Sequence, residues 1–378
     1  MRVMISCGEP SGDLYAGSLA REILALDPSS TITGFGGAQL RAAGASLIGD
    51  YSGLSVTGLL EVARVLPRTY ATYRRLIEEA AARRPDVFVA IDFPDFNFRL
   101  ARALRRLGIP VVYYISPQLW AWRPSRMKTM RRFADRVLVI FAFEEAIYRA
   151  AGVPVEWVGH PLLDAARSPE ARAPFLARQH LDSSKPVVAL LPGSRRNELR
   201  EILPGLASAA RIIRGQLPDA QFILARAPHL PNELFEKLAA DGVPEIEIVE
   251  GATDDVLAAS DVALVASGTV TIQAALHECP MVVVYRLSPI TYRLGRPFVH
   301  VETFAMVNLV AGRMVVPELI QDDFTPEAAA SAALALLQDR AQADRMRAEL
   351  RAVRAKLGER GASRRAAGVV LAVARGGG

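Results

Sequence analysis

Cysteine is scarce in this chain, which holds only Cys7 and Cys279 among its 378 residues. The two lie far apart in the sequence, and each stands next to an apolar run of strand length. This pattern favours two buried thiols in a reducing compartment over a disulfide or a metal-binding pair. The five histidines also lack the spacing of metal ligands, so we expect no metal site.

Long apolar stretches and long charged stretches are missing as well. No stretch reaches the roughly 18 uninterrupted apolar residues of a membrane-spanning helix, and residues 1–6 read as a strand that enters a glycine turn, not as a signal peptide. There is no Lys/Arg-rich tail, and the net charge of +5 permits an anionic ligand, nucleic acid or an anionic lipid surface without choosing among them. We therefore expect a cytoplasmic protein that is at most peripheral to a membrane.

The length and the order of the apolar patterns predict two α/β domains. The 378 residues favour two domains over one, and strand-length apolar runs alternate with helical spacing in both halves. Such alternation is typical of doubly wound parallel sheets. We expect an N-terminal domain over residues 1–165, a linker region rich in proline and charge, and a C-terminal domain over residues 185–335.

Two loops in the C-terminal half each follow a predicted strand and lead into a predicted helix. They contain Gly193, Ser194 and Arg195 in the first loop and Ser267, Gly268 and Thr269 in the second. The N–H groups at a helix start bind anions, and an arginine fork suits phosphate oxygens. Either loop alone is also compatible with an ordinary strand-to-helix turn, but two of them in one α/β domain favour a nucleotide that carries a diphosphate.

Two carboxylates follow a buried-type strand over residues 86–91. In open α/β sheets ligands collect beyond the carboxyl ends of the strands, so Asp92 and Asp95 are candidates for acid–base chemistry. Asp92 comes first after the strand and is the preferred base. Asp95 follows Pro94 and is also placed to cap a helix over residues 96–107, and turn formation explains both residues equally well.

Two further loops at predicted strand ends contain polar or aromatic candidates. They are Ser11, Gly12, Asp13, Trp120, Trp122 and Arg123. The glycine lets the first loop approach a ligand closely, and the tryptophans beside basic residues suit an amphipathic acyl or sugar ligand. Helix capping in the first loop and packing of the tryptophans on the domain are the alternatives.

An apolar segment edged with arginines spans residues 51–79. Its apolar members include Leu54, Leu59, Leu60, Val65 and Leu66, and its basic members include Arg64, Arg68, Arg74 and Arg75. Such a segment can lie on an anionic membrane. The commoner arrangement with this spacing is a core helix that has a solvated basic face.

Taken jointly and in order, nine segments resemble the lipid-A-disaccharide synthase family, which comprises GT-B glycosyltransferases of family 19. They are residues 8–13, 91–97, 116–123, 158–161, 191–195, 266–269, 280–283, 308–313 and 316–321. The resemblance covers nearly the whole length. It implies an α/β fold of two Rossmann-like doubly wound domains that face each other across a cleft, with a C-terminal helix over residues 341–374 that packs back on the N-terminal domain.

The resemblance also implies a reaction. It is a metal-independent, cofactor-free inverting transfer of 2,3-diacylglucosamine from UDP to 2,3-diacylglucosamine 1-phosphate (lipid X), which gives a β-1,6-linked disaccharide 1-phosphate and UDP. Asp92 would take the proton from the attacking hydroxyl, and Arg195 with the start of the helix at 267–269 would neutralise the charge on UDP. Asn308 and Arg313 would complete the donor pocket, with Glu318 and Gln321 as further candidates at its rim.

The expected partners are UDP-2,3-diacylglucosamine, lipid X and the anionic inner face of the cytoplasmic membrane, without nucleic acid. The state of assembly is expected to be a monomer or a homodimer.

Position 273 departs from the family pattern. The resemblance implies a glutamate there that accepts hydrogen bonds from both ribose hydroxyls, whereas this chain has Gln273. Glutamine has one acceptor oxygen and an NH₂ group that only donates, so a weaker or differently shared contact is expected. A UDP-N-acetylglucosamine 2-epimerase-like enzyme and a non-catalytic nucleotide-sugar-binding protein are the alternative functions.

Overall fold

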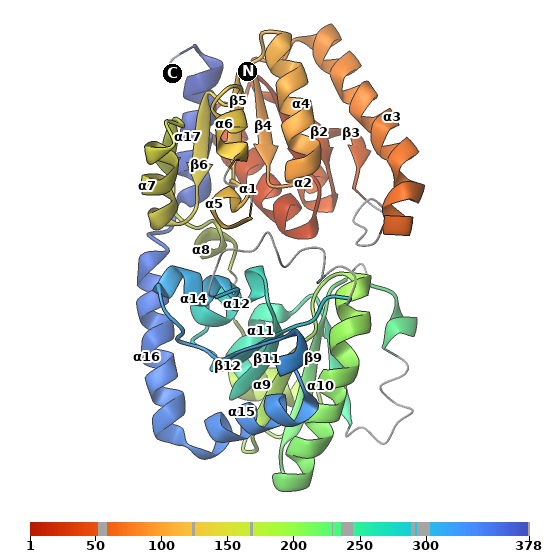
Figure 1. Ribbon diagram of the computed structural model, residues 1–378, viewed down its shortest axis with the longest axis vertical. Coiled ribbons are helices and arrows are strands. Elements are labelled where there is room, and N and C mark those ends of the chain that lie inside the picture. Colours follow the sequence, from red (N-terminus) through yellow and green to blue (C-terminus); the bar gives the residue numbers. More distant parts are fainter. Residues whose placement is uncertain are drawn as a thin grey trace. The chain divides into compact units, whose positions relative to one another are not determined.

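The computed structural model describes the chain except for residues 52–58, 123–124, 167–168, 229, 236–244, 289–291, 293–302 and 377–378, and side chains are described outside 59–65 and 121–122. The described residues form two compact units (Figure 1). Unit 1 comprises residues 1–165 and 357–376, and unit 2 comprises residues 166–288 and 303–356. Each unit is built on its own parallel sheet.

The sheet of unit 1 has the order β3-β2-β1-β4-β5-β6-β7, and every described pairing is parallel. Its strands are β1 (Arg2–Cys7), β2 (Thr31–Gly36), β3 (Ser46–Asp50), β4 (Val87–Ile91), β5 (Val111–Tyr114), β6 (Arg136–Val139) and β7 (Val155–Trp157). Strands β4 and β5 are buried along their whole length. They read as continuous apolar runs because helices cover both faces of the sheet.

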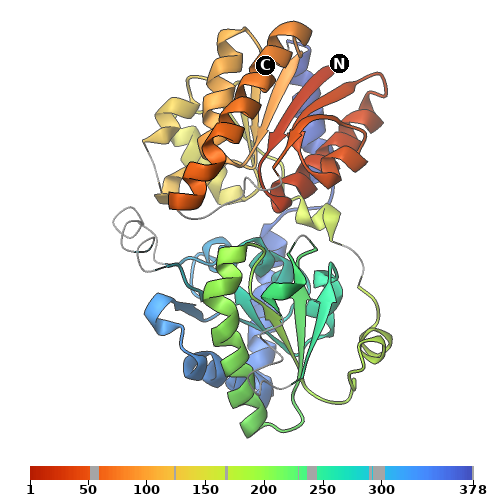
Figure 2. The same ribbon diagram turned by 90° about the vertical axis from the view of Figure 1, so that its right-hand side faces the viewer.

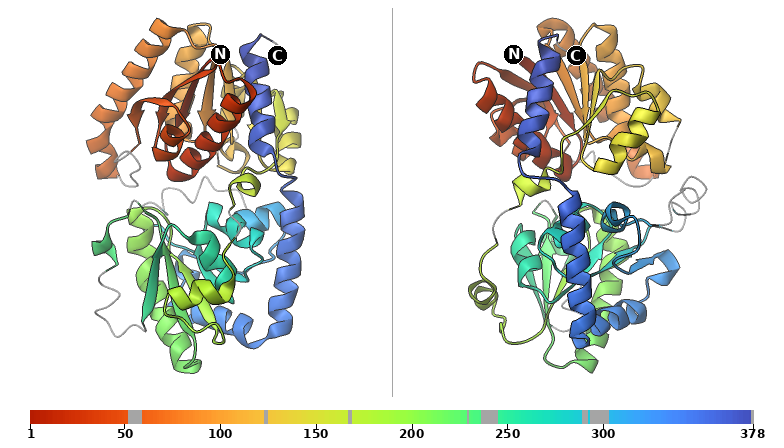
Figure 3. Two further views of the ribbon diagram at one scale, coloured as in Figure 1. Left: turned by 180° about the vertical axis from the view of Figure 1, so that it is seen from behind. Right: turned by 90° about the vertical axis from the view of Figure 1, so that its left-hand side faces the viewer.

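The helices of unit 1 form a layer on each face of this sheet. They are α1 (Pro10–Leu26), α2 (Ala38–Ala42), α3 (Leu59–Arg83), α4 (Pro94–Arg106), α5 (Leu119–Trp122), α6 (Arg126–Met130), α7 (Ala142–Ala150), α8 (Leu162–Ala165) and α17 (Ala362–Ala374). Leu76 of α3 and Leu100 of α4 join Phe88 and Tyr113 in the core on one face. Helices α1 and α17 pack side by side on the other face (Figure 3).

The sheet of unit 2 has the order β10-β9-β8-β11-β12-β13 and is parallel in every described pairing. Its strands are β8 (Val187–Leu191), β9 (Gln221–Arg226), β10 (Ile246–Glu250), β11 (Val262–Ala266), β12 (Met281–Tyr285) and β13 (Glu318–Ile320). Its helices are α9 (Arg172–Arg178), α10 (Arg196–Gln216), α11 (Thr253–Ala259), α12 (Thr269–Leu276), α14 (Met306–Ala311), α15 (Pro326–Gln338) and α16 (Arg340–Lys356). Figure 2 shows α10 running along the sheet, where it packs against β11 and α15.

The C-terminal segment differs from the predicted single helix over 341–374. Helix α16 packs on α12, α14 and α15 of unit 2, and only α17 belongs to unit 1 (Figure 3). The prediction is therefore wrong for the first half of the segment. The break follows from Gly358 (φ 88°) and Gly361 (φ 92°), whose left-handed backbone ends one helix before the next begins. Asp164 then accepts hydrogen bonds from the N–H groups of Gly361 (2.5 Å) and Ser363 (2.9 Å).

Candidate active site

Each sheet gathers its strand-exit loops at one edge, because all of its described strands run in the same direction. We call this the carboxyl edge and the opposite one the amino edge. In unit 1 the chain order changes between β1 and β4, which lie side by side while β2 flanks β1 on its other side. Ligands of open α/β sheets bind at such a switch point. The predicted residues Ser11 and Asp92 follow these two strands.

Asp92 lies directly after β4 in an uncommon backbone conformation. Its φ is 43° and that of Phe93 is 51°, so two consecutive residues other than glycine are in the left-handed region. The Phe93 ring packs over the backbone of Gly8, where a Cβ atom would lie only 2.2 Å from the ring. The side chain of Asp92 is partly exposed. Backbone strain of this kind clusters at functional sites.

Asp95 has a different environment from Asp92. Its side chain is 74% exposed and forms an ion pair with Arg126 at 2.6 Å. The alternative in which Asp95 caps a helix that starts at residue 96 is wrong, because α4 begins at Pro94 and Phe93 occupies the N-cap. The two carboxylates thus have different surroundings, and the choice of Asp92 over Asp95 as the base stays a prediction.

Asp13, a predicted residue, lies in the first turn of α1 and binds the start of α2. This carboxylate is buried and accepts hydrogen bonds from the N–H groups of Gly37 (2.8 Å), Gln39 (2.9 Å) and Leu40 (3.1 Å). Asp13 therefore fixes the start of α2, and the structure gives it a structural role. Gly12 is also buried, whereas Ser11 in the first turn of α1 is partly exposed.

Trp120 and Glu144 form a hydrogen-bonded pair near the ends of β5 and β6. The indole Nε1 of Trp120 donates to Glu144 Oε1 at 3.2 Å, and the Trp120 ring meets Phe143 edge to face. Burial raises the pKa of the Glu144 carboxyl to about 7, although the bond from Trp120 lowers it in part. Sequence reasoning missed Glu144. The sequence signal for Glu144 is a glutamate at the third position of a helix, but the same signal marks an ordinary capping box.

Trp122 lies in α5 without a described side chain, and Arg123 lies outside the described residues. The structure therefore leaves both predictions as they stand. His160 near the end of unit 1 is buried, and its Nδ1 accepts from the Leu162 N–H at 3.2 Å. Burial lowers the pKa of His160 to about 3, so the ring is neutral at neutral pH.

The loop after β8 binds a carboxylate of the protein itself. Glu198 accepts hydrogen bonds from the N–H groups of Ser194 (3.0 Å) and Arg195 (3.2 Å), and its other oxygen accepts from Arg195 Nη1 (2.7 Å). Gly193 makes room for this carboxylate, since a Cβ atom there would lie 2.4 Å from Glu198 Oε2 and φ is 109°. The start of α10 thus binds a carboxylate of its own helix, which the sequence analysis did not foresee. The predicted binding of a ligand anion by this loop stays a prediction.

The second loop of unit 2 leads into α12. Gln273 lies one turn into this helix, and its Nε2 donates to Asp254 Oδ1 at 2.8 Å. The same oxygen lies 2.8 Å from His277 Nε2. A carboxylate can only accept, so the NH₂ group of Gln273 faces Asp254 and its side-chain oxygen takes no part in this bond. Asp254 was not predicted, and it comes from the start of α11, 19 residues earlier in the chain.

Asn308 supports this loop from inside unit 2. It is fully buried, and its Nδ2 donates to Glu318 Oε1 at 2.7 Å. Glu318 in turn accepts from the N–H groups of Phe304 (2.8 Å) and Ala305 (3.0 Å), and the Phe304 carbonyl accepts from Ser267 Oγ (3.4 Å). The side-chain amide of Asn308 thus forms hydrogen bonds inside unit 2, and Asn308 supports the Ser267 loop only indirectly.

Arg313 is a surface residue. Its side chain is 61% exposed and pairs with Glu349 of α16 at 2.6 Å. Gln321, the other rim candidate near β13, is buried, and its Oε1 accepts from the Leu287 N–H at 2.6 Å. The structure therefore joins Gln273 to Asp254, places Ser267 directly after β11 at the carboxyl edge, and turns Arg313 toward α16. Within the described part of the chain, no group of three or more His, Cys, Asp or Glu residues is arranged to hold a metal ion.

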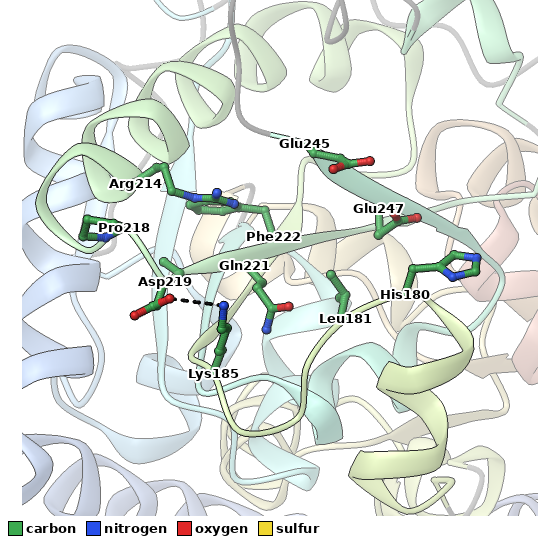
Figure 4. Close-up of a pocket in the computed structure, with 11 residues that line it drawn as sticks. His180, Leu181, Lys185, Arg214, Pro218, Asp219, Gln221, Phe222, Glu245 and Glu247 are labelled. Atoms are coloured by element: carbon green, nitrogen blue, oxygen red, sulfur yellow. Dashed lines mark ion pairs between the residues drawn. The ribbon is translucent and has the colours of Figure 1, made fainter.

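A pocket of about 290 Å³ lies at the amino edge of the unit 2 sheet (Figure 4). Its lining comes from segments that lead into β8, β9 and β10, including Lys185, Asp219 and Phe222. Lys185 pairs with Asp219 at 3.2 Å, and the Arg214 guanidinium lies over the Phe222 ring. This pocket is distinct from the carboxyl edge that carries Ser194 and Ser267.

Comparison with known proteins gives a consistent result along the whole chain. A family model described as Lipid-A-disaccharide synthetase matches residues 3–373. A Lipid-A-disaccharide synthase from Geobacter sulfurreducens is 43% identical over 374 residues, which cover 98% of this chain and 96% of the relative. Another from Anaeromyxobacter dehalogenans is 44% identical over 375 residues, with 99% and 98% covered.

Solved structures with low sequence identity share the fold. The Staphylococcus aureus MnaA–UDP structure has a TM-score of 0.69 at 14% identity, covering 97% of this chain and 94% of that chain. UDP-GlcNAc 2-epimerase from Neisseria meningitidis, bound to UDP-GlcNAc, gives 0.67 at 14% identity, with 98% and 100% covered. The calicheamicin glycosyltransferase CalG4 gives 0.61 at 17% identity, with 98% of both chains covered. The predicted class of two parallel α/β domains of the GT-B type is thereby confirmed.

Proposed function

Since this chain belongs to the lipid-A-disaccharide synthetase family, we propose that it transfers 2,3-diacylglucosamine from UDP to 2,3-diacylglucosamine 1-phosphate. The products are the β-1,6-linked disaccharide 1-phosphate and UDP. The structural observation that carries the proposal is the placement of Asp92. Asp92 is partly exposed and stands at the switch point of unit 1 on a left-handed turn, and this is where we propose that the acceptor hydroxyl binds.

The reaction needs a base at the acceptor and positive charge at the leaving group. Asp92 takes the proton of the acceptor's primary hydroxyl as its oxygen bonds to the anomeric carbon. The bond between that carbon and the diphosphate oxygen breaks, and UDP leaves with the bonding electron pair. Attack from the side opposite the leaving group inverts the configuration at the anomeric carbon.

We assign the leaving diphosphate to the carboxyl edge of unit 2. Arg195 supplies fixed positive charge there, and the start of α12 at Ser267, Gly268 and Thr269 adds N–H groups. Glu198 already neutralises part of this positive field through the Ser194 and Arg195 N–H groups. The side-chain oxygen of Gln273, held by the bond to Asp254, is the proposed acceptor for a ribose hydroxyl.

We expect Asp92→Asn to lower kcat by about 10²–10⁴-fold, because the amide keeps the shape of the carboxylate but cannot accept the proton. UDP affinity should stay close to that of the wild type. The measurement is disaccharide formation followed by mass spectrometry, with Asp95→Asn as the matched control. Wild-type turnover in Asp92→Asn together with loss of turnover in Asp95→Asn would assign the base to the other carboxylate.

We expect Arg195→Ala to weaken UDP binding by about tenfold or more, since a charge-assisted hydrogen bond to the diphosphate is lost. Arg196→Ala is the matched control, because Arg196 is the exposed neighbour with the same charge. Calorimetric titration with UDP compares the two variants. Equal UDP affinity in both would mean that Arg195 serves only its bond to Glu198.

Both proposed substrates carry acyl chains, and we place the protein on the inner face of the cytoplasmic membrane through helix α3. No helix among the described residues is long and apolar enough to cross a membrane. Leu76 and Ala80 of α3 are buried in the core, as the core-helix alternative predicts, but Leu66 and Tyr70 are 53% and 62% exposed. Residues 52–58 and the side chains of 59–65 lie outside the described structure.

The exposed apolar residues of α3 stand beside exposed Arg68, Arg74 and Arg75. An apolar face with a basic edge supplies both attractions to an anionic bilayer, and each arginine near the surface contributes on the order of 1 kcal/mol that salt screens. We expect the protein to float with anionic liposomes at low salt and to be released at high salt.

Two double variants should reduce flotation, namely Leu66→Asp with Tyr70→Asp and Arg74→Glu with Arg75→Glu. Arg345→Glu with Arg354→Glu, on exposed positions of α16, is the control for the change in net charge. Flotation that is insensitive to both α3 variants would exclude this helix as the membrane contact.

A further inference from the structure

The turn at Asp92 and Phe93 is held by two buried side chains that no part of the proposed chemistry uses. Residues other than glycine persist in the left-handed region only where their surroundings determine it. Here φ is 43° at Asp92 and 51° at Phe93. What fixes this turn therefore also fixes the direction in which the Asp92 side chain leaves the main chain.

Asn97 is the first of the two. It is completely buried in the first turns of α4, and its Nδ2 donates to the main-chain carbonyls of Asp92 (2.9 Å), Ser6 (3.1 Å) and Ile91 (3.2 Å). Its Oδ1 accepts from Ser6 Oγ at 2.7 Å. One amide thus ties the end of β4 to the end of the neighbouring strand β1.

Tyr113 is the second. It is completely buried on β5, beside β4 in the sheet, and its hydroxyl donates to the Asp92 carbonyl at 2.8 Å. Burial raises the pKa of the Tyr113 phenol well above its usual range, and the Asp92 carboxylate adds to this shift, so the hydroxyl stays a donor. The Asp92 carbonyl therefore receives one hydrogen bond from α4 and one from β5.

We propose that Asn97 and Tyr113 are positioning residues, which hold the main chain of Asp92 so that its carboxylate keeps the orientation that proton transfer requires. The proposal rests on the proposed function of Asp92 as the base. Small errors in the position of a catalytic group reduce the rate steeply while substrate binding is kept. Loss of a positioning residue should therefore lower kcat alone, whereas loss of a residue that serves folding should also lower stability.

Tyr113→Phe removes one hydroxyl and tests this directly. Tyr114→Phe is the matched control, because Tyr114 is the next residue, is equally buried and points to the opposite face of the sheet. We expect Tyr113→Phe to lower kcat about tenfold, with KM within about twofold of the wild type and a loss of melting temperature no larger than one buried hydrogen bond accounts for. Tyr114→Phe should keep its kcat.

The second measurement adds Tyr113→Phe to Asp92→Asn. If the hydroxyl acts through the carboxylate, the second change should alter the residual rate by less than about twofold, because the group that it orients is gone. Asn97→Asp, which has the same shape without the NH₂ donors, should lower kcat further than Tyr113→Phe. If Asn97→Asp does not fold, the two tyrosine variants decide.

The proposal is overturned if Tyr113→Phe keeps the kcat of Tyr114→Phe, or if both lose kcat together with stability. An undiminished effect of Tyr113→Phe in the Asp92→Asn background also overturns it. Wild-type turnover in Asp92→Asn would overturn both the assignment of Asp92 as the base and the positioning proposal. An inactive Asp92→Asn beside a fully active Tyr113→Phe would overturn the positioning proposal alone.

Discussion

Parallel pairing of the strands is the constraint on which the rest of each unit depends. A parallel pair cannot be closed by a tight turn, so each strand is followed by a crossover that covers a face of the sheet. Both faces are then buried, and the strands become apolar runs such as Val87–Ile91 and Val187–Leu191. The loops that leave the strands all meet at one edge, and there the chain places its polar side chains.

Polar groups in these crowded loops fall into two layers. Asp92 and Ser11 in unit 1 and Arg195 in unit 2 keep some exposure. Asp13, Asn97 and Asn308 are buried instead, and they form hydrogen bonds with main-chain groups of neighbouring segments. A buried polar atom without a partner is costly, so inner residues of this kind must be satisfied within the protein. The polar residues that can face a ligand are therefore fewer than the polar residues that follow the strands.

The sequence predicted the fold well, because the signals for it are local. Apolar runs, glycine turns and helical spacing each span fewer than about 20 residues, and their alternation leads to parallel sheets. The preference for Asp92 over Asp95, which stays a prediction, came from local order as well, since only Asp92 directly follows the strand. The break between α16 and α17 was missed because Gly358 and Gly361 sit inside a stretch whose alanine and arginine content favours helix on both sides.

The roles of the inner residues could not be read in the same way. Asn97 meets Ser6 across 91 positions of sequence, and Asp13 meets Leu40 across 27. Glu198 is close in sequence to Arg195, but a glutamate three residues into a helix marks a capping box whether or not a ligand binds. Such contacts depend on the completed sheet, which brings distant loops to one edge.

The proposed placement of the nucleotide at the carboxyl edge of unit 2 is tested most directly by hydrogen–deuterium exchange with and without UDP. Slower exchange is expected in peptides that cover residues 193–198 and 267–273, with no change in peptides that cover 214–222 at the amino edge. Protection at the amino edge, around Lys185, Asp219 and Phe222, with none at the carboxyl edge would contradict this placement.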